Sequence, residues 1–317
     1  MRAVRFHTFG SPAVLQIEHI EQPVPHHDEV LIRVAATSIN SADLGARQGH
    51  SRLIHARHMP MIPGYDVAGE VVACGPAVTA FVPGERVFGL VGLRAGGSAE
   101  YISVAQEKLA RAPEQITLVE TAAVPLAGLT ALQGLRGKGQ ARAGQQALIV
   151  GAAGGVGIFA VQLAKIIGCH VTAVCRASKQ DFVAGLGADE VIDSTQHNYT
   201  ASGGTWDLIF DASGVQDFDS ARRVLQPHGR MVGTRVSPRN VLAAARSRVQ
   251  GGPCFRFLIT KASGHDLALL ARLIDQDRLR PIVDRTFPME QVVDAHSYVE
   301  SGRSRGKVVV QMSPDLV

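Results

Sequence analysis

Short apolar runs separated by turn residues dominate the first third of the chain. Strand-like runs occupy residues 14–17, 29–34 and 67–72, and prolines and a Pro-Gly pair lie between them. Runs of this length that alternate with turns are typical of strands rather than helices. Residues 1–110 therefore predict a small β-rich barrel.

The pattern changes after residue 118, where strands and helices alternate. Residues 146–150 form an apolar run that enters a glycine cluster, and residues 156–163 then place apolar side chains at helical spacing. Residues 170–175 form a second apolar run at the distance that a β-α-β unit of about 30 residues requires. This alternation predicts a doubly wound parallel sheet up to about residue 262.

The glycine cluster between the first strand and helix predicts a dinucleotide site. Ala152 occupies the first position of the G-x-G-x-x-G pattern, while Gly154 and Gly157 keep the other two. Backbone without side chains lets a pyrophosphate approach the positive end of the following helix. An ordinary glycine-rich turn is the alternative. The backbone residues expected at the pyrophosphate are Ala153, Gly154, Gly155 and Val156.

The residues after the second strand predict the preferred cofactor. An enzyme that prefers NAD would carry an acid there, because a carboxylate binds both ribose hydroxyls. This chain instead has Arg176, Ser178 and Lys179, which would bind a 2′-phosphate and would not repel it. The sequence therefore predicts NADPH, the alternative being that these polar residues are a solvated helix start.

Composition narrows the class of protein. The 317 residues are 46% hydrophobic and 19% charged, with a formal net charge of +4, as expected of a globular protein large enough for two domains. The basic residues are dispersed, so neither nucleic acid nor a membrane is expected as a partner. Four unpaired cysteines and the lack of an apolar leader or long apolar span predict a cytoplasmic location.

Several motifs occur in a fixed order that resembles a known family. They occupy residues 38–43, 62–71, 82–89, 96–101 and 121–131, followed by the glycine turn. Together they resemble the medium-chain dehydrogenases/reductases over nearly the whole chain. More narrowly, they resemble the zinc-free quinone oxidoreductase (zeta-crystallin-like) branch, close to the mitochondrial reticulon-interacting reductase type.

The resemblance implies a fold and a division into domains. The fold expected is α/β, with a GroES-like β-rich catalytic domain and a doubly wound Rossmann domain. Residues 1–120 and 264–317 would form the first domain, and residues 121–263 the second. In relatives the last strand of the Rossmann sheet pairs across a two-fold axis, so residues 254–260 predict a homodimer.

The same comparison addresses the metal. Zinc enzymes of this superfamily hold the ion with Cys and His ligands, whereas this chain carries residues 38–43 and Gly64-Tyr65-Asp66 at the corresponding positions. Cys74 is the only cysteine before the glycine turn, so the four-cysteine structural lobe is missing. His55 and His58 have no obvious partner for a metal site. We expect no bound metal.

The resemblance also implies contacts with the cofactor beyond the turn. Backbone near Ala212 and Gly233 would lie along the ribose and nicotinamide, and Lys307 would approach the cofactor from the tail. Thr130 would be a further cofactor-binding residue. One departure concerns the 2′-phosphate, because Ser194 stands where relatives often carry a Tyr. Tyr199 in the next loop is a possible substitute.

Without a metal, the hydride acceptor must already be electrophilic, as a quinone or an alkene conjugated to a carbonyl is. Asn40 is a candidate for holding substrate or nicotinamide, because its amide donates hydrogen bonds without titrating. His50 is a candidate proton donor, since related reductases often place a Tyr near this position. A solvent-facing His50, with water delivering the proton, is the alternative.

The sequence therefore predicts an NADPH-dependent, zinc-independent reductase of quinones or α,β-unsaturated carbonyl compounds, by one- or two-electron reduction. An enoyl-thioester reductase is an alternative within the same class and would need a long apolar cleft. An NADPH-binding partner or RNA-binding protein with little turnover is an alternative from a different class.

Overall fold

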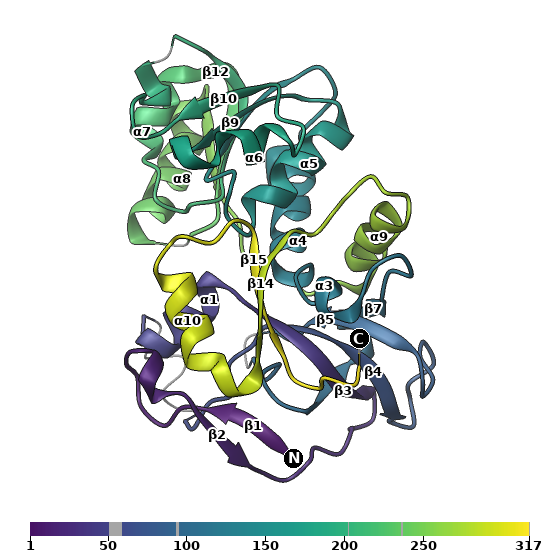
Figure 1. Cartoon of the computed structure of the whole chain (residues 1–317). Coiled ribbons are helices and arrows are strands. Elements are labelled where there is room, and N and C mark those ends of the chain that lie inside the picture. The colour runs from purple at the N-terminus through teal and green to yellow at the C-terminus, as the bar shows by residue number, and fades with distance from the viewer. Residues whose placement is uncertain (51–58, 93–94, 202, 236, 317) are drawn as a thin grey trace. The chain divides into compact units, whose positions relative to one another are not determined.

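The computed structural model describes residues 1–50, 59–92, 95–201, 203–235 and 237–316. The chain divides into two compact units (Figure 1). Residues 1–126 and 261–317 form the first, here the β-rich unit, and residues 127–260 form the second, here the Rossmann unit. The chain therefore leaves the β-rich unit once and returns to it for its last segment.

The β-rich unit is built on a mixed sheet. Its path is β14-β15-β3-β4-β5-β7, β6 pairs with β3, and β1 pairs with β2 in a separate two-stranded sheet. The strands are β1 (Arg2–Arg5), β2 (Gln16–His19), β3 (Glu29–Ile39), β4 (Asp66–Cys74), β5 (Arg86–Leu90), β6 (Tyr101–Ala105), β7 (Leu109–Arg111), β14 (Val283–Pro288) and β15 (Lys307–Gln311). Its α-helices are α1 (Ser41–Gln48), α3 (Leu118–Thr121), α9 (Gly264–Asp275) and α10 (Val292–Glu300), and α4 (Pro125–Leu132) continues along the chain into the Rossmann unit.

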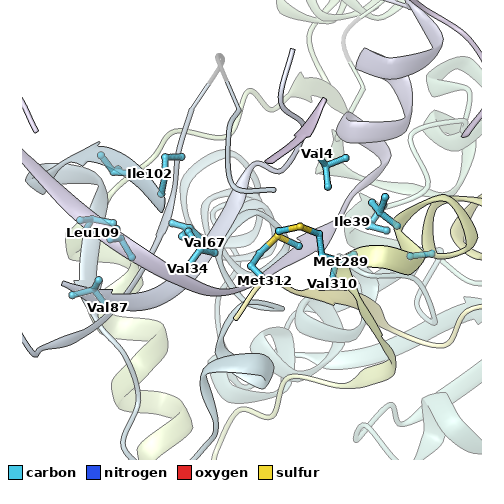
Figure 2. Close-up of a cluster of buried hydrophobic side chains, with 14 of the residues drawn as sticks. Val4, Val34, Ile39, Val67, Val87, Ile102, Leu109, Met289, Val310 and Met312 are labelled. Carbon is cyan, nitrogen blue, oxygen red and sulfur yellow. The ribbon is translucent and has the colours of Figure 1, made fainter. Parts of the chain in front are cut away.

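Strand β3 organises the β-rich unit, because it pairs with β4, β6 and β15. Residues Val30, Ile32 and Val34 of this strand are fully buried. Side chains from β3, β4 and β15 meet in one apolar core, together with Met289 and Met312 from the C-terminal segment (Figure 2). The tail is thus part of this core although it follows the Rossmann unit in sequence.

The Rossmann unit holds a six-stranded, wholly parallel sheet in the order β10-β9-β8-β11-β12-β13. The strands are β8 (Gln146–Val150), β9 (His170–Cys175), β10 (Glu190–Asp193), β11 (Trp206–Asp211), β12 (Leu225–Gly233) and β13 (Cys254–Phe257). The α-helices are α5 (Gly157–Ile167), α6 (Gln180–Ala184), α7 (Phe218–Ala221) and α8 (Pro238–Gln250), and a π-helix, η4, spans Gln133–Gly139.

The direction of winding reverses beside β8. From β8 the chain builds the sheet outward through β9 to β10, and then continues through β11 on the other side of β8. Helices leave adjacent strands in opposite directions at such a point, which opens a crevice at the carboxyl ends of the strands. The predicted α/β fold, a GroES-like β-rich unit with a doubly wound Rossmann unit, is confirmed by the topology and by the comparisons below.

Candidate functional site

The glycine turn follows β8 at the reversal point of the sheet. Gly151 has a φ of 76°, and the N–H groups of Gly151 and Ala152 both donate to the Val174 carbonyl of β9 at 3.1 Å. Gly154 N–H then closes the turn on the Gly151 carbonyl at 3.0 Å. The backbone therefore enters α5 in a conformation held by the neighbouring strand.

Gly157 begins α5 and packs directly against this turn. A Cβ added at Gly157 would lie 2.2 Å from the Gly151 carbonyl oxygen and 2.6 Å from the backbone of Ala152. Only a residue without a side chain fits between helix and turn, which is the role of the last glycine in a dinucleotide-binding turn. Of the residues expected at the pyrophosphate, Ala153 is buried, Gly154 is exposed, and Gly155 and Val156 are partly exposed.

Ala212 and Gly233 lie at the carboxyl ends of neighbouring strands. Gly233 pairs with Asp211 in the ladder of β12 and β11, and Ala212 N–H donates to the Val150 carbonyl at 3.0 Å. Asp211 holds the loop after β11, because its carboxylate accepts from Ser213, Gly214 and Gln216 backbone N–H groups at 2.9–3.0 Å. Ala212 and Gly233 therefore lie, like the glycine turn, at the carboxyl ends of the strands of the Rossmann sheet.

Thr130 belongs to α4 and is buried. Its hydroxyl lies 2.8 Å from the hydroxyl of Thr260, which follows β13 at the carboxyl end of the sheet. The contact between the Thr130 and Thr260 hydroxyls therefore holds this predicted cofactor residue at the carboxyl ends of the strands, although the two residues are far apart in the chain. A role for Thr130 at the cofactor stays a prediction.

The residues predicted at the 2′-phosphate follow β9. Arg176 and Ser178 are exposed, Lys179 is half-buried, and residues 177–179 form a short 3₁₀ turn. Asp193 at the end of β10 accepts from the Thr195 N–H and hydroxyl at 2.9 and 2.7 Å, and also from the Ala177 N–H of this loop. Hydrogen bonds from Thr195 lower the pKa of Asp193, so this acid is ionised and already bonded within the protein.

Tyr199 does not take the place of the missing tyrosine. The residue is 5% exposed, and its ring packs edge-on against Trp206 with the ring centroids 6.2 Å apart. Burial raises the pKa of Tyr199 to about 12. Tyr199 is therefore part of the hydrophobic core of the Rossmann unit.

The β-rich unit contains a buried polar cluster of Ser38, Asn40, Asp43, Asp66 and Lys307. Asp43, Asp66 and Lys307 are at most 2% exposed, and Asn40 is 9% exposed. Charged side chains are almost never buried unless they are paired. Three buried charges around one amide therefore identify this cluster as the candidate site of the unit.

Asp66 is the acceptor at the centre of the cluster. One carboxylate oxygen accepts from the Leu126 N–H at 2.7 Å, while the other accepts from Asn40 Nδ2 at 2.8 Å and from the Ser38 hydroxyl. Lys307 Nζ lies 3.5 Å from the same oxygen and donates to Asn40 Oδ1 at 2.5 Å. The amide of Asn40 is thus held between an anion and a cation.

Asp43 links the start of α1 to the segment at Gly64. Its carboxylate accepts from the Asn40 N–H at 2.9 Å, at the start of α1, and from the Gly64 N–H at 2.7 Å. Burial raises the pKa of Asp43 to about 6 and lowers the pKa of Lys307. The cluster therefore ties the two predicted motifs at residues 38–43 and 64–66 together.

The structure joins Asn40 and Lys307 but leaves His50 apart. Asn40 caps the start of α1, whereas His50 is exposed beyond its end and donates its N–H to the Gly45 carbonyl. The eight-residue helix between them is about 12 Å long. His55 and His58 lie outside the described residues.

Sequence reasoning placed Asp43 and Asp66 inside motifs but assigned neither of them a role in the site. The signal that could have identified them is an acid at the edge of an apolar run, as Asp66 is before Val67 and Ala68. No local pattern connects these acids with Lys307, because the contact joins the first third of the chain to its last strand.

Within the described residues, no group of three or more His, Cys, Asp and Glu side chains could hold a metal ion. In the same part of the chain, no helix is long and apolar enough to cross a membrane.

The fold and the two sites define a class, the dinucleotide-binding oxidoreductases with a GroES-like unit. Residues 26–114 match the alcohol dehydrogenase GroES-like domain family, and residues 186–310 match the zinc-binding dehydrogenase family.

Similar proteins narrow the class. The chain is 34% identical to the chloroplastic quinone-oxidoreductase QR1 of Triphysaria versicolor, over 98% of each chain. It is 35% identical to the chloroplastic NADPH-dependent alkenal/one oxidoreductase of Arabidopsis thaliana, over 99% of this chain and 80% of the relative. The structure of the quinone oxidoreductase from Coxiella burnetii matches with a TM-score of 0.91 and 28% identity, over 99% of both chains. The chain belongs to the quinone oxidoreductase branch of the medium-chain dehydrogenase/reductase superfamily.

Proposed function

We propose that this protein transfers a hydride from NADPH to quinones or α,β-unsaturated carbonyl compounds. The observation that carries the proposal is the glycine turn at the reversal point of the Rossmann sheet, in a chain of the quinone oxidoreductase branch. The hydride carries two electrons to the acceptor and leaves NADP⁺, and a proton from the protein or from water completes a hydroquinone or a saturated carbonyl compound.

The preference for NADPH rests on the loop after β9. Arg176 is exposed there, and no acid occupies residues 176–179. The nearby Asp193 carboxylate already accepts hydrogen bonds from Thr195 and from the Ala177 N–H. A guanidinium binds a phosphate through two parallel hydrogen bonds. Support also comes from the Arabidopsis relative, which is named as NADPH-dependent.

Zinc independence is supported by the side chains that surround Asp66. Both of its oxygens already accept hydrogen bonds, and the cation beside it is the Lys307 ammonium. Ser38 and Asn40, which share this carboxylate, are not residue types that structural or catalytic zinc sites ordinarily use. The acceptors proposed here are electrophilic before they bind, so the reaction does not require a Lewis acid.

Three further assignments belong to the same proposal. His50 is exposed and remains a candidate proton donor, with water as the alternative.

β13 forms one edge of the Rossmann sheet, which supports a homodimer paired along that edge. A cytoplasmic location is also proposed, although the Triphysaria relative is named as chloroplastic.

The test is NADPH oxidation, followed by its absorbance, with a panel of quinones, enones and enoyl thioesters. Turnover of quinones or enones, with NADPH preferred to NADH, supports the proposal. Turnover of enoyl thioesters alone would indicate the thioester reductase. Tight NADPH binding without turnover of any acceptor would indicate a binding protein instead.

A further inference from the structure

Helix α8 of the Rossmann unit packs on the sheet through small residues. Ala244 and Ser247 are its buried residues. The Ser247 hydroxyl donates to the Ala244 carbonyl at 3.0 Å and accepts from the Phe255 N–H of β13 at 3.1 Å. The face of α8 that contains these two residues is therefore the face fixed against the sheet.

The large aliphatic residues of α8 are exposed on another face. Val241, Leu242 and Val249 are 46%, 58% and 89% exposed, and Ala245 is exposed as well. At about 100° per residue, these four residues, here the outer stripe, fall within about 100° of one another around the helix. A surface helix normally turns its apolar residues toward the core. A contiguous apolar stripe that is exposed instead indicates a binding surface.

Three exposed arginines of α8 border the outer stripe, namely Arg239, Arg246 and Arg248. By the same helical spacing, Arg239 and Arg246 lie on one side of the stripe and Arg248 lies on the other. Arg239 pairs with Asp217 at 2.6 Å and Arg246 lies 3.8 Å from Asp219, but α8 itself carries no acid. The outer stripe is therefore an aliphatic surface between cationic borders.

Charge determines which partner fits this surface. Residues 220–260 contain eight arginines and no aspartate or glutamate, so a second copy docked through the same face would bring like charges together. Single-stranded nucleic acid is bound by stacking its bases on aromatic side chains, and α8 has none. Aliphatic residues bordered by arginines are instead typical of a helix that lies in the interface of an anionic membrane.

We propose that α8 docks this protein on an anionic lipid surface. The outer stripe enters the interface, and the bordering arginines meet the lipid phosphates. The expectation that no membrane is a partner rested on the dispersed charge of the whole chain, whereas residues 220–260 are locally cationic. The inference goes beyond the proposed function and does not depend on it, because docking requires neither NADPH nor an acceptor.

Vesicle sedimentation tests the proposal. The full-length protein is mixed with vesicles of phosphatidylcholine alone or of phosphatidylcholine with phosphatidylglycerol, and its partition coefficient is measured. Burial of a leucine or valine side chain corresponds to about 10-fold in partitioning, and an arginine beside an anionic surface to about fivefold. We expect Leu242→Gln and Val249→Gln each to bind the mixed vesicles about 10-fold more weakly, and Arg248→Gln about fivefold more weakly.

Two matched controls carry the same substitutions elsewhere in the Rossmann unit. Val215→Gln replaces a valine that is 69% exposed, and Arg136→Gln replaces an exposed arginine. We expect both controls to bind the mixed vesicles like the wild type, and wild-type binding to weaken as the salt concentration rises. Losses in the controls equal to those in the α8 variants would overturn the proposal, because no particular face would then dock.

Three other results would also overturn it. The first is wild-type protein that does not sediment with the mixed vesicles. The second is unchanged binding by both Leu242→Gln and Val249→Gln, because charge alone would then hold the protein, as it would on any polyanion. The third is a dimer that Leu242→Gln converts to a monomer in analytical ultracentrifugation while vesicle binding is unchanged, because the outer stripe would then contact a second copy. Circular dichroism checks the folding of each variant, and two glutamine variants at separate positions keep the test decisive if one of them does not fold.

Discussion

The substitution Gly157→Ala tests the packing of α5 against the glycine turn. The added Cβ would lie 2.2 Å from the Gly151 carbonyl oxygen, whereas ordinary contacts begin near 3.4 Å. The atoms it meets are all backbone, so no side chain can rotate away and the helix or the turn must move by about 1 Å. The Gly151 carbonyl also accepts the Gly154 N–H, so this movement disturbs the hydrogen bond that closes the turn.

Overpacking of this kind costs about 1–3 kcal/mol, and alanine recovers less than about 1 kcal/mol through its higher helix propensity. We expect a loss of about 2 kcal/mol in the free energy of unfolding of the Rossmann unit. We also expect NADPH to bind about 10-fold more weakly, which corresponds to about 1.4 kcal/mol, because the backbone amides of the turn leave their positions.

The assay uses the single tryptophan of the chain. Trp206 is 4% exposed in the core of the Rossmann unit, so its fluorescence during urea unfolding reports on this unit. The matched control is Gly137→Ala, because a Cβ at Gly137 meets no atom within 4 Å. Equal stability and equal NADPH affinity in the two variants would refute the packing argument.

Three further predictions concern the cofactor, pH and metal. Arg176→Glu should lower the ratio of kcat/KM for NADPH to kcat/KM for NADH by about 10-fold or more. The control Arg248→Glu, at an exposed residue, should leave this ratio unchanged. Equal ratios in the two variants would contradict the assignment of Arg176 to the 2′-phosphate. Asp43 has its pKa raised from 3.8 to about 6 in the fold, so its protonated form stabilises the protein below pH 4. That contribution, about 3 kcal/mol, is lost as the pH rises to 6. The unfolding free energies of wild type and Asp43→Asn should diverge across this range, and parallel curves would contradict the pKa. Dialysis against a chelator should leave quinone turnover unchanged, with metal content measured in the same sample; activity restored by zinc would contradict zinc independence.

Local patterns determined the elements and the nucleotide turn. The apolar run at residues 146–150 and the glycines after it predict a strand, a turn and a helix from neighbouring residues alone. β8, the turn and α5 follow this order in the structure. The close packing at Gly157 requires a residue without a Cβ, and the identity of that one residue can be read directly from the sequence.

The polar cluster was decided only by tertiary structure. In the sequence, nothing distinguishes Lys307 from a lysine on the protein surface. In the structure, the pairing of β15 with β3 buries its ammonium against Asn40 and Asp66. The same long-range packing assigned Tyr199 to the core beside Trp206 and left His50 at the far end of α1 from Asn40. Burial and hydrogen bonding between distant segments depend on strand register and core packing, and no short stretch of sequence contains that information.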